Sequence, residues 1–289
     1  MREGYLRVLV LVALSLFAEV PQARAQCPVS PDTANTITRY FHSDLGFVTD
    51  LERAAVSRAL SFIEKGGTET VGMFERLVAD LRGTAPTDVS GVANVRDLVK
   101  AIAVAQNEQQ AIAYVRALDR FWPARSQGIA MADPFGNGAT SNIRRVAGGS
   151  VSEMFEMAAA HWLVENGHYT PDQFVAFGRK VLLTSPLDVT PASGFAEADH
   201  LIESGRRIVS DAKYTLNQPL DIGGANFDAD TVRKWARGLR DSDFAEVIVP
   251  TNGTPSNGLA NKIAQIFESE SATLHLSQVR IVYVAIPGF

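Results

Sequence analysis

Cysteine is almost absent from this chain of 289 residues, in which Cys27 is the only one. A single thiol cannot form an intrachain disulfide, and it cannot supply a cysteine zinc cluster. Long apolar runs are also absent after the N-terminal region, because no later stretch approaches the roughly 20 apolar residues of a membrane-spanning helix. The sequence therefore excludes a disulfide-stapled scaffold, a cysteine zinc finger and, beyond its N-terminus, an integral membrane protein.

An excess of positive charge is missing as well. The chain has 27 Lys and Arg against 32 Asp and Glu, which gives a formal net charge of −5. This balance argues against broad electrostatic coating of nucleic acid, but it leaves room for a local basic groove. An apolar content of 46% and a charged content of 20% are typical of globular proteins, and the length allows two domains.

Several nucleotide-binding and hydrolase motifs are also absent. The glycine-containing segment 136–141 lacks the third glycine and the preceding strand of a dinucleotide fingerprint, and there is no Walker loop. The chain has no Gly-x-Ser-x-Gly nucleophile elbow and no His-Glu-x-x-His zinc helix. His161 and His168 lie seven residues apart with Gly167 between them, so we do not expect them to share a metal.

The N-terminus has the pattern of a secretory signal peptide over residues 1–25. Arg2 and Arg7 form a positive n-region, residues 8–17 form an apolar run, and Ala23-Arg24-Ala25 fits the small-x-small cleavage pattern. We therefore expect cleavage after Ala25, a secreted or periplasmic protein, and no integral membrane association afterwards. The alternative is an N-terminal anchor that is retained.

The rest of the chain divides into two expected domains. Residues 26–122 carry apolar stripes at helical spacing and predict a small helical bundle. Residues 123–149 are rich in Gly, Pro, Ser and Asn, which favours a linker or long loop. Residues 150–289 mix helical and strand patterns, so the fold class expected for the whole chain is α+β, with a mixed central sheet flanked by helices in the second domain.

Within the second domain, Ser150 and Glu153 form a capping-box pattern at the start of a helix that ends near Gly167. Residues 170–183 have helical spacing and a helix-start signal, so they predict a second helix, which leaves 187–197 as a candidate first strand. A hairpin turning at Ser204-Gly205 follows. After it we expect a helix, a strand, a helix and a last strand, at 230–239, 244–249, 256–267 and 279–286.

Acidic residues and one lysine gather on this hairpin. Asp211 and Lys213 are two apart on the second strand, so they project from one face, and Asp199 lies on the first strand. A two-residue loop would place Asp199 on the opposite face, whereas a three-residue loop or a bulge would place both carboxylates together. Close carboxylates repel unless a cation or proton lies between them. His200 alternates away from Asp199, so we interpret it as a packing or surface residue.

Four residues remain as catalytic candidates: Glu156, Asp199, Asp211 and Lys213. Glu156 borders the apolar stripe of the first helix, and Ala198-Asp199 precedes Asp211-Ala212-Lys213 across the hairpin. In this order the chain resembles the PD-(D/E)xK, or restriction-endonuclease-fold, nucleases. That family places an acid on its first core helix, an Asp on a following strand and Asp/Glu-x-Lys on the next. The resemblance covers about residues 150–286, and segment 232–263 is further similar to nuclease domains of bacterial polymorphic toxins.

The resemblance implies a restriction-endonuclease-like domain and a metal-dependent phosphodiesterase acting on DNA or RNA. Asp199, Asp211 and Glu156 would bind Mg²⁺ or Mn²⁺, and Lys213 would orient the attacking water or stabilise the developing charge. The likeness to toxin domains further implies a toxin or effector with an immunity or delivery partner. Weaker candidates for contacts with nucleic-acid phosphates are basic side chains of the hairpin turn and the following helix: Arg206, Arg207, Arg233, Lys234, Arg237 and Arg240.

Two other functions stay open on the sequence alone. One is a secreted binding protein with a catalytically decayed nuclease fold, whose helical N-terminal part carries the activity. The other is a different hydrolase that uses paired carboxylates, such as a glycosidase. A structural ion cluster on a strand pair is a third interpretation of Asp199, Asp211 and Lys213. Cleavage that requires Mg²⁺ and is abolished by EDTA would support the nuclease alone.

Overall fold

A computed structural model describes residues 28–41, 49–82, 93–122, 139–181, 196–214, 220–222, 227–239, 242–251, 258–270 and 274–289. The expected signal peptide over residues 1–25 lies outside these ranges. Within them, no helix is both long and apolar enough to cross a membrane. The helices of this part are α2 (Pro31–Phe41), α3 (Asp50–Lys65), α4 (Gly67–Leu81), α5 (Val95–Val104), α6 (Glu108–Arg120), α7 (Ala139–Ala147), α8 (Val151–Glu165), α9 (Ala229–Gly238) and α10 (Leu259–Glu270).

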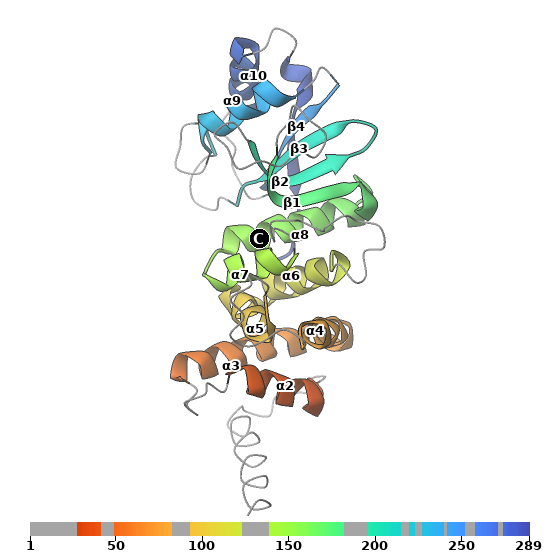
Figure 1. Ribbon diagram of the computed structural model, residues 1–289, viewed down its shortest axis with the longest axis vertical. Coiled ribbons are helices and arrows are strands. Elements are labelled where there is room, and N and C mark those ends of the chain that lie inside the picture. Colours follow the sequence, from red (N-terminus) through yellow and green to blue (C-terminus); the bar gives the residue numbers. More distant parts are fainter. Residues whose placement is uncertain are drawn as a thin grey trace, which may run out of the picture.

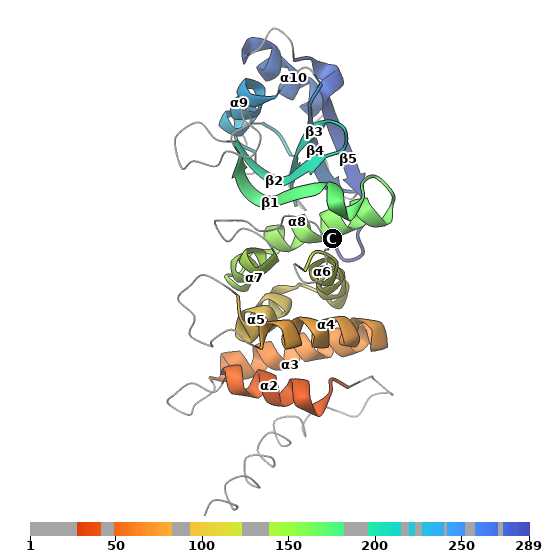
Figure 2. The ribbon, with the colours of Figure 1, turned by 45° about the vertical axis from the view of Figure 1, so that its right-hand side comes forward.

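The molecule is elongated, with helices at one end and a sheet at the other (Figure 1). Helices α2 to α7 are stacked on one another, and α8 lies between this stack and the sheet. Helices α9 and α10 cover the far side of the sheet (Figure 2). The strands are β1 (Phe174–Val181), β2 (Ala196–Glu203), β3 (Arg207–Ala212), β4 (Phe244–Pro250) and β5 (Val279–Val284), and short 3₁₀ turns at Pro171–Gln173 and Leu276–Gln278 precede β1 and β5.

The sheet is mixed, with the strand order β1-β2-β3-β4-β5. The pairs β1–β2 and β2–β3 are antiparallel, whereas β3–β4 and β4–β5 are parallel. Helix α9 connects β3 to β4 and α10 connects β4 to β5, as parallel neighbours require a crossover. The predicted α+β class, with helices flanking a mixed sheet, is therefore confirmed.

One predicted helix is wrong. Residues 170–183 were expected to be helical, but Pro171–Gln173 forms one 3₁₀ turn and Phe174–Val181 is strand β1. The register of β1 against β2 shifts between Phe174 and Ala176, and Phe174 and Phe177 are both buried, with their rings stacked at 5.5 Å. A bulge thus reproduces the three-residue spacing of a helix within a strand. The first strand of the sheet is consequently β1, and not residues 187–197.

Two apolar clusters fill the molecule, one on each face of the sheet. On the far face, β-strand residues pack against Trp235 of α9 and Ile263 of α10. On the other face, a single cluster runs from Ile37 of α2 through α8 to Val284 of β5 and Phe289. The last part of the expected linker is also ordered, as helix α7. The helical part and the sheet thus share one core, and their independence as domains stays a prediction.

Candidate active site

A three-residue turn closes the hairpin between β2 and β3. The turn is Ser204-Gly205-Arg206, in which Gly205 has a φ of +70° and the Ser204 amide donates to the Arg206 carbonyl at 2.9 Å. The register pairs His200 with Ser210 and Leu201 with Val209. Extending this register by one residue pair places Asp199 opposite Asp211, on the same face of the sheet. Of the two loop lengths that the sequence allowed, the structure has the one that unites the carboxylates.

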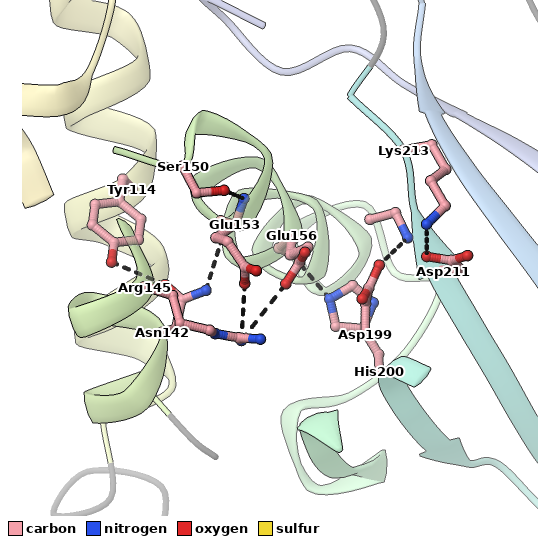
Figure 3. A network of polar contacts seen from close by, with 11 residues as sticks. Tyr114, Asn142, Arg145, Ser150, Glu153, Glu156, Asp199, His200, Asp211 and Lys213 are labelled. Atoms are coloured by element: carbon pink, nitrogen blue, oxygen red, sulfur yellow. Dashed lines mark hydrogen bonds and ion pairs between the residues drawn. The ribbon is translucent and has the colours of Figure 1, made fainter. Parts of the chain in front are cut away.

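The two aspartates are held by backbone and lysine donors (Figure 3). Oδ2 of Asp199 accepts a hydrogen bond from the Ala212 amide at 2.7 Å. Oδ1 of Asp211 lies 2.8 Å from Nζ of Lys213. The amide of Lys213 donates to the Ile248 carbonyl of β4 at 2.8 Å, which fixes this lysine at the end of β3. Asp199, Asp211 and Lys213 therefore form one contiguous polar cluster, as the sequence predicted.

Glu156 approaches this cluster from α8, on the Asp199 side (Figure 3). Arg145 of α7 holds it in place, because one Nη atom lies 3.8 Å from Glu156 and 3.0 Å from Glu153. The two glutamates differ, as expected. The amide of Glu153 donates to the Ser150 hydroxyl at 3.3 Å, whereas the Glu153 carboxylate pairs with Arg145 and does not complete the predicted capping box.

His200 is a packing residue, one of the two interpretations that its sequence position allowed, but its hydrogen-bond partners were not predicted. Its ring is fully buried, between Glu156 of α8 and Ser210 of β3. Nε2 donates to the Glu156 carbonyl at 2.9 Å, and Nδ1 lies 3.3 Å from the Ser210 hydroxyl. His200 follows Asp199 in the sequence, and its partner Ser210 precedes Asp211. The imidazole therefore links the backbone at Glu156 to the strand positions beside the two aspartates. The alternation of strand residues shows that His200 faces away from Asp199, but it gives no sign of this partner.

Burial and crowding change the titration of the acids. Burial raises the pKa of Asp211 well above its ordinary value, the nearby Asp199 raises it further, and Lys213 lowers it only in part. Burial also raises the pKa of Glu156 strongly, with Asp199 and Glu153 adding to the effect and Arg145 opposing it. For Lys213, burial lowers the pKa, but the charges of Asp211 and Asp199 outweigh it and the pKa is raised. The cluster thus has a shortage of positive charge.

The donor atoms fit a hard cation. Asp211 is 3% exposed, and its Oδ2 is buried without a hydrogen-bond partner. A carboxylate oxygen of this kind suits Mg²⁺ or Mn²⁺, which prefer oxygen ligands and retain several waters. Within the described ranges, however, no three His, Cys, Asp or Glu side chains lie close enough together to hold a metal by themselves. A bound cation would therefore take Asp199 and Asp211, and reach Glu156 through a water or after a side-chain movement.

The basic candidates for phosphate contacts lie in two places. Arg233, Lys234 and Arg237 of α9 are paired with acids: Arg237 lies 2.9 Å from Glu270, and Lys234 lies 3.3 Å from Asp230. Arg206 and Arg207 lie at the hairpin turn, at the end of β3 away from Asp211. Arg240 lies outside the described residues. The structure therefore does not bring these cations onto the acidic cluster.

Comparison of the chain with protein-family models, with curated proteins and with solved structures gives no match. The functional assignment consequently depends on the geometry of the site.

Proposed function

We propose that this protein is a secreted, metal-dependent nuclease that hydrolyses phosphodiester bonds of DNA or RNA. The observation that carries the proposal is the placement of Asp199 opposite Asp211 on paired strands, with Nζ of Lys213 2.8 Å from Asp211. The order of elements supports it: an acid on α8, an Asp on β2, and Asp-x-Lys at the end of β3 with the lysine directly after the strand. This is the order in which PD-(D/E)xK nucleases carry their site, and it favours a restriction-endonuclease-like domain with a role as a toxin or effector.

Each residue of the site would have a separate role in hydrolysis. Asp199 and Asp211 would hold Mg²⁺ or Mn²⁺, and Glu156 would bind one of its waters or join it directly. The cation supplies Lewis acidity and lowers the pKa of a bound water. The raised pKa of Lys213 keeps its ammonium charged at neutral pH, so Lys213 can donate to the phosphate oxygens as negative charge develops on them. His200 keeps the backbone at Glu156 beside the strands.

The runner-up is a binding protein with a decayed nuclease fold. One observation favours it: in the part of the chain that the structure describes, three potential metal ligands do not come together. The two candidates make opposite predictions for catalysis and for metal binding, so the same assay separates them.

The decisive experiment is a cleavage assay on plasmid DNA and on total RNA, with Mg²⁺, with Mn²⁺ and with EDTA. We expect cleavage that EDTA abolishes and added Mg²⁺ restores. Asp211→Asn should lose it, and Lys213→Ala should retain metal binding but lose about 10²–10³-fold in turnover, as removal of a transition-state donor typically does. Arg82→Gln, directly after the distant helix α4, is the purification-matched control and should be fully active. Activity that persists in Asp211→Asn would show a contaminant, and no cleavage of either substrate would refute the proposal.

A further inference from the structure

A pocket of about 270 Å³ lies on the face of the sheet opposite to the Asp211 side chain. Its walls come from the residues that follow α8, from the β2–β3 turn, and from β4 and β5. Its polar lining consists of His168, Tyr169, Ser204, Arg206, Glu246 and Arg280.

This pocket is separate from the candidate active site. Glu246 of β4 pairs in register with Ser210 of β3, next to Asp211 in the sequence. Successive residues of a strand face opposite sides of the sheet, so Glu246 and Asp211 point to different faces. The pocket and the acidic cluster therefore cannot act on the same group of a ligand.

Two arginines of the pocket stack on one aromatic ring. The guanidinium carbon of Arg280 lies 3.8 Å from the centre of the Phe244 ring, and that of Arg206 lies 5.0 Å from it. A guanidinium that stacks through its flat face keeps the N–H donors along its edges available. Within the described residues, neither Arg206 nor Arg280 forms a salt bridge. Their donors are thus held in place for an oxyanion, which guanidinium binds in a bidentate manner.

One acid, Glu246, also lines the pocket. Glu246 is 2% exposed, and its Oε2 accepts a hydrogen bond from the Tyr169 hydroxyl at 2.8 Å. Burial raises the pKa of Glu246, even though Tyr169, Arg280 and Ser210 lower it. The pocket therefore has two positive charges, on Arg206 and Arg280, against one buried acid, in a chain whose net charge is −5.

We propose that this pocket binds a phosphoryl oxyanion, with Arg206 and Arg280 as its charged ligands and Ser204 as an additional donor. The volume accommodates a phosphate that carries a small organic group. Such a phosphate has two sources, a free small molecule and the backbone of a polynucleotide. The proposal does not depend on catalysis at Asp199 and Asp211.

The test is titration of the purified full-length protein in EDTA, which prevents any metal-dependent cleavage. The three probes are inorganic phosphate, AMP and a single-stranded oligonucleotide. The affinity of each is measured by isothermal titration calorimetry. We expect at least one probe to bind, and Arg206→Gln and Arg280→Gln each to weaken its binding at least tenfold. Arg206 is exposed on the turn, so its replacement should preserve the fold even if loss of Arg280 from Phe244 does not. Arg280→Lys keeps the charge without the planar fork and should bind less tightly than the wild type.

The matched control is Arg82→Gln, which removes a positive charge from the surface of the helical part and should leave every probe's affinity unchanged. Binding of phosphate or AMP that Arg206→Gln weakens would identify a free small molecule as the source. Binding of the oligonucleotide alone, with the same loss, would identify a polynucleotide backbone. The proposal is wrong if no probe binds, or if Arg206→Gln and Arg82→Gln behave alike.

Discussion

Asp211 illustrates how a side chain that serves a site can weaken the fold. Its raised folded-state pKa means that the folded protein holds a proton that the unfolded chain releases, so this group's stabilising effect is complete at low pH. That contribution decreases as the pH rises above the ordinary pKa of an aspartate. Asp211→Asn should therefore be as stable as the wild type near pH 4 and more stable at pH 7, with the difference growing between them. Urea unfolding of both proteins at several pH values measures this difference in the free energy of unfolding.

The control for this prediction is the histidine beside the site. The lowered pKa of His200 destabilises the fold as the pH falls below 6.5, which is the opposite trend, and Asp211→Asn retains it because burial is its main cause. Only the difference between the two proteins reports on Asp211. A difference that shrinks as the pH rises would mean that Asp211 is ionised and well compensated in the folded protein.

Glu153 and Glu156 form a matched pair on one helix, three residues apart and both near Arg145. Glu153→Gln should cost about 1 kcal/mol or less, the usual range for a partly exposed ion pair, and leave cleavage intact. Glu156→Gln should reduce metal-dependent cleavage by at least about tenfold, as loss of a group that orients a metal's ligands does. Its stability should be unchanged or higher, because the pKa of Glu156 is raised. If Glu153→Gln proves the more damaging to cleavage, Glu153 is the metal-site residue.

At the scale of elements, α8 and the hairpin are joined through His200. His200→Phe fits the surrounding aromatic rings of Phe174 and Phe177, but it removes the hydrogen bonds of the imidazole to the Glu156 carbonyl and to the buried Ser210 hydroxyl. We expect a loss of about 1–3 kcal/mol in the free energy of unfolding, which is the cost of an unsatisfied buried polar group. The Mg²⁺ concentration needed for half-maximal cleavage should also increase.

His200→Gln provides the check on that interpretation, because its amide can still donate to the carbonyl. It should recover part of both losses. An equal loss of stability in the two variants, with no change in Mg²⁺ requirement, would assign His200 a packing role alone.

Sequence reasoning succeeded where contacts follow from local spacing. Asp211 lies on β3 and Lys213 directly after it, and the alternation of extended residues suffices to place them together. It failed at β1, because the bulge between Phe174 and Ala176 gives a strand the spacing of a helix. It also could not locate the phosphate pocket, whose polar side chains come from four separate segments of the chain. The role of Arg145 was missed because its helix, α7, lies in a region whose composition indicates a loop.

At the scale of the whole molecule, the shared core predicts how the chain responds to division. Met154 and Phe155 of α8 belong to the cluster that also includes Tyr114 of α6. A fragment of residues 150–289 would expose this face of α8, at about 25 cal/mol for each Å² of apolar surface left in water. We expect the fragment to be less stable than the full chain and to bind the apolar dye ANS. Calorimetry compares the unfolding temperatures of the fragment and of the full chain. A fragment as stable as the full chain would demonstrate independent domains.

The position of β5 in the chain has a consequence for how the protein is made. During synthesis, α2 to α6 can pack as they emerge, because their partners are close in sequence. Helix α8 acquires its partners later, because the Phe155 ring packs against that of Phe289, 5.5 Å away, and shares a cluster with Val284 of β5. Until the ribosome has finished the last strand, the nascent sheet and the helix beneath it lack the residues that close their core. A chain that completes this core only after β5 is made stays open for longer, which suits the export that we propose for it.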